Sequence, residues 1–331
     1  MSSSLPYSSK QPHIPSPGVW CPVVTFFNHG NDQLDLSSQA KYFAYLAGSG
    51  LTGIVALGTD SEAFLLTREE RFVIIATARK AVGSSFPVMA GVGCHSTKQT
   101  IQLAEDAAKA GADYVLVLPP AYFGKATNMN VVKRFYIEVG AKSPLPVVIY
   151  NCPGVCNGVD MDSETITEIV RESAVSHPSG RCNIVGVYLA CDSVGKMTRL
   201  SATFGREQLS IFGGQSDFLL AGLAAGSSGA IASLANVFPS LTAKMYKLYK
   251  EGWIEEATKL QKIAALAESP CKSGIAATKY AVACYAAKAA GIDKAEQKLA
   301  PRHPYEPVDE AVKKKIWKQM EQAAKTSQNL H

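Results

Sequence analysis

Hydroxyl-bearing side chains come at the ends of several short apolar runs in this sequence: Thr59, Tyr122, Tyr150 and Tyr188. A hydroxyl both donates and accepts a hydrogen bond, so neighbouring hydroxyls can pass a proton to or from a bound molecule. Any single tyrosine could equally fill space in the interior of the fold with its hydroxyl in water. Three tyrosines at one edge of a fold would indicate a site for proton transfer, so the elements that position them decide the matter.

Eight short runs, each nearly continuous in apolar residues, lie at 19–27, 53–58, 87–93, 113–120, 146–153, 183–190, 209–214 and 229–235. Such runs are typical of parallel strands that are buried on both faces. The segments between them have helical spacing, as in 67–83 and in 97–111, which ends on a glycine. Strict alternation implies a parallel sheet with right-handed crossovers, and eight repeats predict an α/β fold, a (β/α)8 TIM barrel over residues 18–250.

The chain changes character on either side of the predicted barrel. Helical patterns follow at 238–269, 274–291 and 308–325, and the first of these is expected to include the eighth barrel helix. We therefore expect residues 251–331 to hold the last barrel helix continuing into a C-terminal helical extension. Residues 1–17 are rich in serine and proline without an apolar centre, which predicts a disordered leader and not a signal peptide.

Composition excludes several classes of function. The formal net charge is +5, and the only basic run is "KKK" at 313–315, which is typical of the exposed face of a helix, so no nucleic-acid partner is expected. The sequence contains no stretch of 18 apolar residues, so no membrane span is predicted. The eight cysteines are scattered, and the one close pair, Cys152 and Cys156, lacks the spacing of a zinc site. We expect reduced thiols, a cytoplasmic location, no metal and no cofactor; the absence of G-x-G-x-x-G after the first strand argues against a dinucleotide.

In a (β/α)8 barrel, chemistry takes place at the C-terminal ends of the strands. Here those ends read "GTDSEA" (58–63), "PPAYFG" (119–124), "YNCPGVCNG" (150–158), "YLACDS" (188–193) and "GGQSD" (213–217). The three tyrosines, Thr59 and a glycine pair belong to these segments. The fold therefore predicts that they surround a common pocket.

At these strand ends the sequence resembles the dihydrodipicolinate synthase / N-acetylneuraminate lyase family of pyruvate-dependent class I aldolases. The segments that carry the resemblance are "GLTGIVALGTDSEAFLLTREER" (50–71), "AGVG" (90–93), "AGADYVLVLPPAY" (110–122), "VVIYNCPG" (147–154), "NIVGV" (183–187) and "GAIASLANVFP" (229–239). The stretch "LACDSVGKMTRL" (189–200) is similar to the fungal branch that splits 2-keto-3-deoxy sugar acids or 4-hydroxy-2-oxoglutarate. The resemblance implies a small 2-keto acid as ligand and a homotetramer or tight homodimer.

The resemblance also implies roles for individual residues. Tyr150 matches the catalytic tyrosine that moves protons to and from the substrate, and Thr59 matches the threonine that links it into a relay. Tyr122 matches a second relay tyrosine, which in parts of the family reaches across a dimer interface. Gly214 and the backbone at Ile231 match positions that line the keto-acid pocket.

The sequence departs from the family at the nucleophile. The family's lysine stands on the sixth strand in the pattern G-[ILVT]-K, where its amine forms a Schiff base with pyruvate. Here Tyr188 takes that position after Gly186 and Val187, and a phenol cannot form an imine. Lys196 is eight residues further on, and Lys125 in a neighbouring loop is the other lysine that could enter the pocket.

Two further departures concern groups that hold carboxylates. The family's G-T-T-G-E turn, which binds the substrate carboxylate, reads Gly58, Thr59, Asp60, Ser61 and Glu62 here. An aspartate beside a carboxylate costs Coulomb energy unless it is protonated or paired, and serine lacks the conformational freedom of glycine. The arginine that dihydrodipicolinate synthases carry after Y-N-x-P is absent, with Val155 or Cys156 in its place, which argues against that synthase activity.

Three hypotheses remain open from the sequence. The first is a lyase of the family that cleaves or condenses a 2-keto acid. The second is a catalytically silent paralogue that binds a small metabolite. The third is different chemistry in the same barrel, assisted by a metal ion held by Asp60, Glu62 and His95, although no motif spacing supports it.

Overall fold

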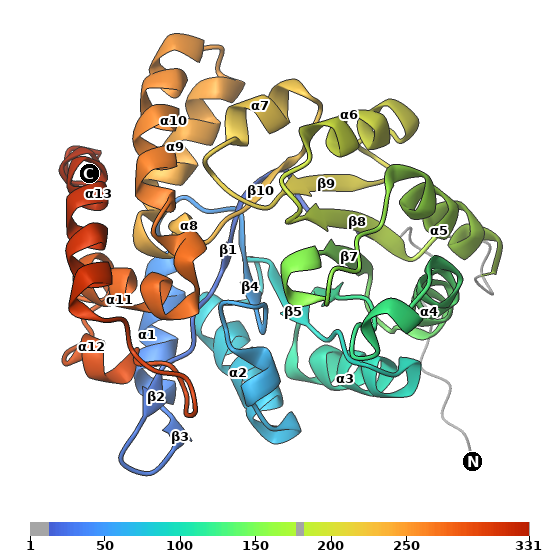
Figure 1. Ribbon diagram of the computed structural model, residues 1–331, viewed down its shortest axis with the longest axis horizontal. Coiled ribbons are helices and arrows are strands. Elements are labelled where there is room, and N and C mark those ends of the chain that lie inside the picture. Colours follow the sequence, from blue (N-terminus) through green and yellow to red (C-terminus); the bar gives the residue numbers. More distant parts are fainter. Residues whose placement is uncertain (1–12, 177–181, 331) are drawn as a thin grey trace.

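The computed structural model describes residues 13–176 and 182–330, and its centre is a closed barrel of eight parallel strands (Figure 1). Around the barrel the strands follow the order β1-β10-β9-β8-β7-β6-β5-β4, so strands that are consecutive in the chain pair with each other, and β10 pairs with β1 to close the barrel. Their bounds are β1 Gly18–Pro22, β4 Gly53–Ala56, β5 Val88–Gly91, β6 Tyr114–Val117, β7 Val147–Asn151, β8 Ile184–Leu189, β9 Ser210–Gly213 and β10 Gly229–Ile231. The predicted (β/α)8 TIM barrel is confirmed.

The observed strands are shorter than the apolar runs that predicted them. The run 19–27 gives β1 up to Pro22, and its end belongs to a small hairpin of β2 Phe27–Asn28 with β3 Gln33–Leu34. The run 229–235 gives β10 up to Ile231 and then enters the short helix α8 Leu234–Val237. In both cases the apolar residues beyond the strand remain buried, so hydrophobicity alone did not mark where pairing stops.

Helices surround the barrel and are set by local signals. Their bounds are α1 Leu36–Ala47, α2 Arg68–Val82, α3 Thr97–Ala110, α4 Met129–Lys142, α5 Ser163–Ser176, α6 Val194–Thr203, α7 Leu219–Ala224 and α9 Pro239–Lys250. Helix α2 starts with a capping box between Thr67 and Glu70, and α3 ends at Gly111 in the left-handed conformation (φ 96°). Single 3-10 turns lie at η1 Ala63–Leu65, η2 Gly124–Ala126, η3 Pro153–Val155 and η4 Cys271–Ser273.

The barrel interior is filled by side chains that alternate with those facing the helices. Trp20 lies at its centre, edge-on to Tyr114 and to Phe212, with 6.1 Å between ring centroids in each pair. Ile231 and Val148 belong to the same buried cluster. The barrel is therefore a packed core whose inner residues support whatever lies at its two ends.

Residues 13–17, which we expected to belong to the disordered leader, pack against the N-terminal end of the barrel. The Ser210 hydroxyl donates to the carbonyl of Pro15 (2.7 Å), and the Trp20 indole N–H donates to that of Ser16 (3.1 Å). The His13 ring bonds the Tyr114 hydroxyl at 2.9 Å. These bonds order the segment, so the predicted leader extends too far; its residues 1–12 lie outside the described part of the chain.

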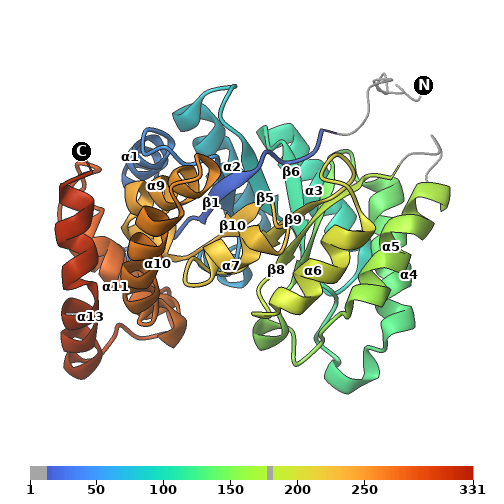
Figure 2. The ribbon, with the colours of Figure 1, turned by 90° about the horizontal axis from the view of Figure 1, so that it is seen from above.

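The C-terminal part of the chain forms a helical layer on one side of the barrel (Figures 1 and 2). The stretch 238–269 holds two helices, α9 and α10 Ile254–Glu268, because the chain turns at Gly252 (φ 86°). The eighth barrel helix, α9, ends at Lys250, and α10 packs beside it. The layer continues through α11 Ile275–Tyr285, α12 Ala295–Lys298 and α13 Glu310–Gln328. Across the described residues, none of the helices is long and apolar enough to span a membrane.

Candidate active site

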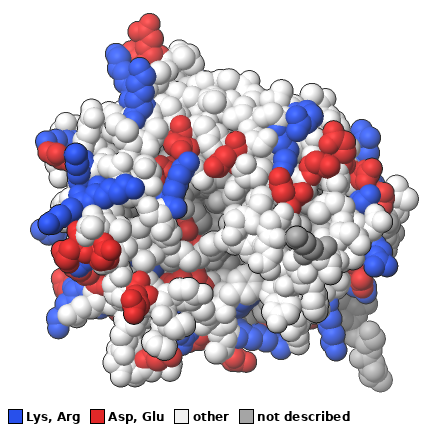
Figure 3. All heavy atoms as spheres, in the orientation of Figure 1, with Lys and Arg blue, Asp and Glu red and all other residues white. Residues whose placement is uncertain are grey.

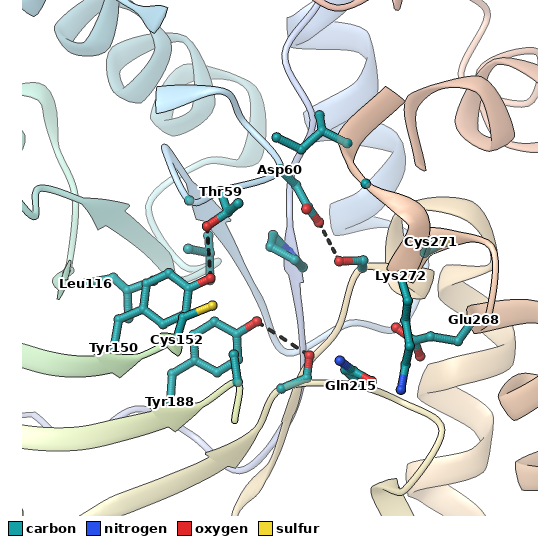
Figure 4. Close-up of a pocket in the computed structure, with 18 residues that line it drawn as sticks. Thr59, Asp60, Leu116, Tyr150, Cys152, Tyr188, Gln215, Glu268, Cys271 and Lys272 are labelled. Carbon is teal, nitrogen blue, oxygen red and sulfur yellow. Dashed lines mark hydrogen bonds between the residues drawn. The ribbon is translucent and has the colours of Figure 1, made fainter. Parts of the chain in front are cut away.

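A cavity of about 230 Å³ opens at the C-terminal ends of the strands. The barrel supplies one side of it and the segment between α10 and α11 supplies the other (Figure 4). Figure 3 shows a hollow near the centre of one face of the molecule, with acidic and basic side chains around it. The residues that line the cavity are Pro22, Val55, Gly58, Thr59, Asp60, Leu116, Tyr150, Cys152, Tyr188, Ala190, Gly214, Gln215, Ser233, Glu268, Cys271, Lys272, Gly274 and Ile275.

Two tyrosines on adjacent strands form one wall of the cavity. Tyr150 of β7 and Tyr188 of β8 are partners in the strand register, so their rings stack with 4.5 Å between centroids and 12° between planes. The Tyr150 hydroxyl lies 3.0 Å from Oγ1 of Thr59, and the Tyr188 hydroxyl lies 3.5 Å from the carbonyl oxygen of Gly214. Burial raises the pKa of both phenols well above 10, so both keep their protons at neutral pH and act as hydrogen-bond donors.

The turn after β4 places Thr59 against Tyr150. The N–H of Ser61 donates to the carbonyl of Gly58 (3.2 Å), and that of Glu62 donates to the carbonyl of Thr59 (3.0 Å). Glu62 adopts a left-handed conformation (φ 56°), which is uncommon for a residue with a side chain. Its carboxylate is buried and pairs with Lys279 of α11, while the N–H of Arg302 donates to its second oxygen (2.8 Å). The C-terminal layer therefore holds the turn in place.

Asp60 lies in the same turn but faces the cavity. Its Oδ2 accepts a hydrogen bond from the Ser233 hydroxyl (2.7 Å). Burial raises the pKa of Asp60 to about 6, and the hydrogen bond from Ser233 opposes that rise only in part. The cavity thus contains a carboxyl group that is uncharged over much of the acid range.

The far wall carries ionisable groups that no motif in the sequence had indicated. Glu268, at the end of α10, accepts hydrogen bonds from the backbone N–H of Ser216 (2.7 Å), from its hydroxyl, and from the N–H of Leu234 (3.4 Å). Burial raises the pKa of Glu268 to about 7. Lys272 pairs with Asp217 at 2.6 Å. Burial lowers the pKa of Lys272, but the bond to Asp217 outweighs this and leaves it above the ordinary value, so the ammonium stays charged.

The structure brings together only part of the predicted site. Gly58, Thr59, Asp60, Tyr150, Tyr188 and Gly214 line the cavity. The Ser61 hydroxyl instead donates to the carbonyl of Val23, and Ile231 is buried inside the barrel and does not line the cavity. Tyr122 is 70% exposed and packs against His95 and Phe123 outside it. The side chain of Lys125 lies outside the described residues.

The residues considered for a metal site point in different directions. Asp60 bonds to Ser233, Glu62 pairs with Lys279, and the His95 ring stacks on Phe64 with 5.8 Å between centroids. In the described part of the chain, no three His, Cys, Asp or Glu side chains are grouped so that they could hold a metal ion. The geometry does not support metal-assisted chemistry through these three residues.

Comparisons with known proteins agree with one another. Residues 15–323 match the dihydrodipicolinate synthetase family. The chain is 60% identical over 313 residues, 95% of this chain and 97% of the relative, to a Coccidioides immitis protein provisionally named 4-hydroxy-2-oxoglutarate aldolase, mitochondrial. It is 35% identical over 286 residues, 83% of this chain and 88% of the relative, to the L-threo-3-deoxy-hexylosonate aldolase of Hypocrea jecorina.

Solved structures give the same result. A crystal structure of a Coccidioides immitis protein, provisionally assigned to the dihydrodipicolinate synthase family, superposes with a TM-score of 0.89. It is 56% identical, and the match covers 97% of this chain and 99% of that one. An Escherichia coli prophage protein of the same family, solved in complex with pyruvate, superposes with a TM-score of 0.79 at 25% identity over 92% of this chain and 98% of that one.

Proposed function

Because the chain belongs to the dihydrodipicolinate synthetase family, we propose that its cavity binds a small 2-keto acid and that the protein acts on it as an aldolase-type lyase. The observation that carries the proposal is the arrangement of Tyr150, Tyr188 and Thr59, whose hydroxyls face one cavity at the C-terminal end of the barrel. Relatives named 4-hydroxy-2-oxoglutarate aldolase and L-threo-3-deoxy-hexylosonate aldolase support this substrate class, as does a family structure that contains pyruvate. A cavity of about 230 Å³ suits such a ligand, since pockets for drug-sized molecules have about 300–1,000 Å³.

In aldol cleavage a 4-hydroxy-2-keto acid loses the proton of its 4-hydroxyl and the bond between C3 and C4 breaks. The bonding electrons move toward the keto group, an aldehyde leaves, and C3 takes up a proton to give pyruvate. Tyr150 and Thr59, with 3.0 Å between their oxygens, form a relay in which each hydroxyl releases its own proton as it receives another, so that the proton leaving the 4-hydroxyl is matched by one delivered to C3. The reaction then needs no net proton from solvent.

Tyr188 determines how the keto group is activated. A phenol donates a hydrogen bond to the keto oxygen, where negative charge develops, and forms no covalent intermediate. Its contact with the carbonyl of Gly214 is long, at 3.5 Å, so the hydroxyl can turn to a ligand at little cost. Among the described residues that line the cavity, Lys272 is the one lysine, and its ion pair with Asp217 keeps the amine protonated and poorly nucleophilic.

Because Tyr188 forms no imine, it also favours a second candidate, a catalytically silent paralogue that binds a 2-keto acid without cleaving it. An imine stabilises the electrons released by carbon–carbon cleavage far better than a hydrogen bond does, and enzymes must lower such barriers by at least about 8 kcal/mol. The buried Asp60 in the turn that binds carboxylates in the family points the same way.

One set of measurements separates these candidates. Pyruvate binding is measured by calorimetry, and aldehyde release is measured with 4-hydroxy-2-oxoglutarate and with a 2-keto-3-deoxy sugar acid. For a lyase we expect turnover that falls about 10²–10⁴-fold in Tyr150→Phe, the range for loss of a general acid–base group. Pyruvate binding without turnover supports the silent paralogue, and failure to bind pyruvate contradicts both.

Borohydride reduction in the presence of pyruvate tests the role of Tyr188 directly. We expect mass spectrometry to find no pyruvate adduct on the wild-type protein and an adduct on Tyr188→Lys. Lys272→Gln is the matched control, because it removes the lysine that lines the cavity. An adduct that forms on the wild type and disappears in Lys272→Gln would contradict the non-covalent mechanism.

We also propose that the protein is a homodimer or homotetramer. Phe64, Tyr122 and Phe123 are 55%, 70% and 75% exposed and cluster around the His95 ring, and large apolar side chains that cluster on a surface mark an interface. Light scattering on wild type and Tyr122→Glu tests this, with a shift to smaller particles expected for the variant. We also propose a cytoplasmic location. The relative from Coccidioides immitis is named mitochondrial, so the two locations are alternatives that microscopy of the tagged protein distinguishes.

A further inference from the structure

The wall of the cavity that faces the tyrosines is built by a different part of the chain. Glu268 ends α10, Cys271 and Lys272 belong to the connection from α10 to α11, and all three lie across the cavity from Tyr150 and Tyr188 (Figure 4). Asp60 and Ser233 complete this wall from the ends of barrel strands. A keto group held by the tyrosines therefore directs the rest of the ligand toward these charged and polar groups.

The charges on this wall offer nothing to a second carboxylate. Lys272 is the one cation among the described lining residues, and Asp217 neutralises it at 2.6 Å. Asp60 and Glu268 supply no positive charge, because a carboxyl group is neutral when protonated and negative when ionised. A carboxylate at the far end of a ligand would therefore meet no unpaired positive charge and up to two negative ones.

Asp60 supplies an unused hydrogen-bond acceptor on this wall. Asp60 accepts the Ser233 hydroxyl on Oδ2, and no bond within the described chain engages its Oδ1. A hydroxyl can donate to such acceptors, whereas an ionised carboxylate carries no proton to donate.

The wall is also held in position before any ligand arrives. Glu268 is buried and bonds to Ser216 after β9 and to Leu234 after β10, which ties the end of α10 to two barrel loops. Gln261 adds a second tie, since its amide donates to the carbonyl of Ser216 (2.7 Å). A preorganised wall can discriminate between ligands because it does not rearrange to fit each of them.

We propose that this wall, formed by Asp60, Gln215, Ser233, Glu268 and Lys272, binds the half of the substrate that leaves as aldehyde and selects a neutral hydroxylated chain over a second carboxylate. The proposal rests on the proposed 2-keto-acid function and narrows it. It makes 2-keto-3-deoxy sugar acids the preferred substrates over the dicarboxylate 4-hydroxy-2-oxoglutarate. Specificity then belongs to a wall that barrel loops and the C-terminal layer build together, and proton transfer belongs to the tyrosine wall.

Two probes of equal chain length test the proposal without turnover. 2-Oxoglutarate carries a second carboxylate, 5-hydroxy-2-oxopentanoate carries a hydroxymethyl group at the same place, and neither has the 4-hydroxyl that aldol cleavage requires. We expect calorimetry at pH 7.5 to show the hydroxy acid binding at least about tenfold more tightly than the dicarboxylate, the discrimination that one well-placed polar contact gives. Equal affinity, or tighter binding of 2-oxoglutarate, would overturn the inference.

Variants locate the discrimination on the wall. Asp60→Asn is expected to reduce the preference about tenfold, and Glu268→Gln is expected to reduce it as well, in both cases mainly through tighter 2-oxoglutarate binding. Glu172→Gln, which removes an exposed charge on α5, is the control for net charge and should leave the preference unchanged. An unchanged preference in both wall variants, each checked for folding by circular dichroism, contradicts the proposal. Pyruvate is titrated in parallel, so a wild-type protein that does not bind it identifies a failure of the proposed function instead.

Discussion

Asp60 and Glu62 belong to the same turn, yet their carboxyl groups lie in two different regions of the molecule. Glu62 points into the C-terminal layer, where Lys279, itself 0% exposed, and the N–H of Arg302 surround it. Asp60 points into the cavity, where a hydroxyl is its only partner among the described residues. Both groups are removed from bulk water, but only one has a cation.

This difference shows that burial does not by itself determine what a carboxylate does. Beside Lys279, Glu62 forms a buried ion pair that ties the turn to α11, and the ammonium also lies 4.6 Å from the centre of the Phe27 ring. Burial lowers the pKa of Lys279 to about 8, although the charge of Glu62 opposes this. Without a cation, Asp60 has its pKa raised to about 6 and becomes a group that changes charge near the cavity. The first carboxylate contributes to structure and the second to recognition.

Breaking the ion pair should have the largest effect on stability. Lys279→Met leaves the Glu62 carboxylate buried without its cation, which costs about 3–5 kcal/mol of unfolding free energy. Urea denaturation measures the loss. The double variant Lys279→Met with Glu62→Gln removes both charges and should recover most of it. A double variant as unstable as the single one would show that packing, and not charge, holds the turn.

Asp60 should have a smaller effect that depends on pH. Its folded pKa of about 6 lies above the unfolded value of about 4, so the folded state binds the proton more tightly. A shift of this size contributes about 2–3 kcal/mol to the free energy of unfolding. That contribution is fully present below pH 4, decreases between pH 4 and 6, and is absent above pH 6. Relative to wild type, Asp60→Asn should therefore become more stable as the pH rises through this window. A difference that does not change with pH would mean that Asp60 titrates normally.

The smallest effect concerns the hydroxyl that faces Asp60. Ser233→Ala removes the hydrogen bond that favours the ionised form, so the pKa of Asp60 should rise further. The variant should lose about 1 kcal/mol of stability at pH 7, the usual contribution of such a bond. Thermal unfolding measures the loss, and carbon-13 NMR titration of the carboxyl groups measures the pKa. An Asp60 pKa that falls in Ser233→Ala would contradict the assignment of the bond.

Sequence reasoning reached the barrel and one wall of the cavity because both depend on strands. Continuous apolar runs mark buried parallel strands, and a residue near the end of such a run, such as Tyr150 or Tyr188, lies at the catalytic end of the barrel. It did not show that the Ser61 hydroxyl bonds to the carbonyl of Val23 or that the Ile231 side chain lies inside the barrel, since a turn and a buried strand present only some of their side chains to the cavity.

The other wall could not be found in this way. Glu268 and Lys272 come from a break between two helices, and nothing in their local pattern indicates that they return to the barrel. Only the packing of α10 beside α9 brings them there. The break "ESPCKSG" at 268–274 predicts a connection but not its neighbours.

The connection between α10 and α11 has a consequence for how such a protein changes over time. The barrel strands must keep their side chains to remain folded, so substitutions there are constrained by packing on both faces. A short loop anchored by Glu268 can accept new residues at positions such as Lys272 without disturbing a strand. Evolution or protein engineering can therefore change which ligand binds at the end of the barrel by substituting a few residues of a segment that lies outside it.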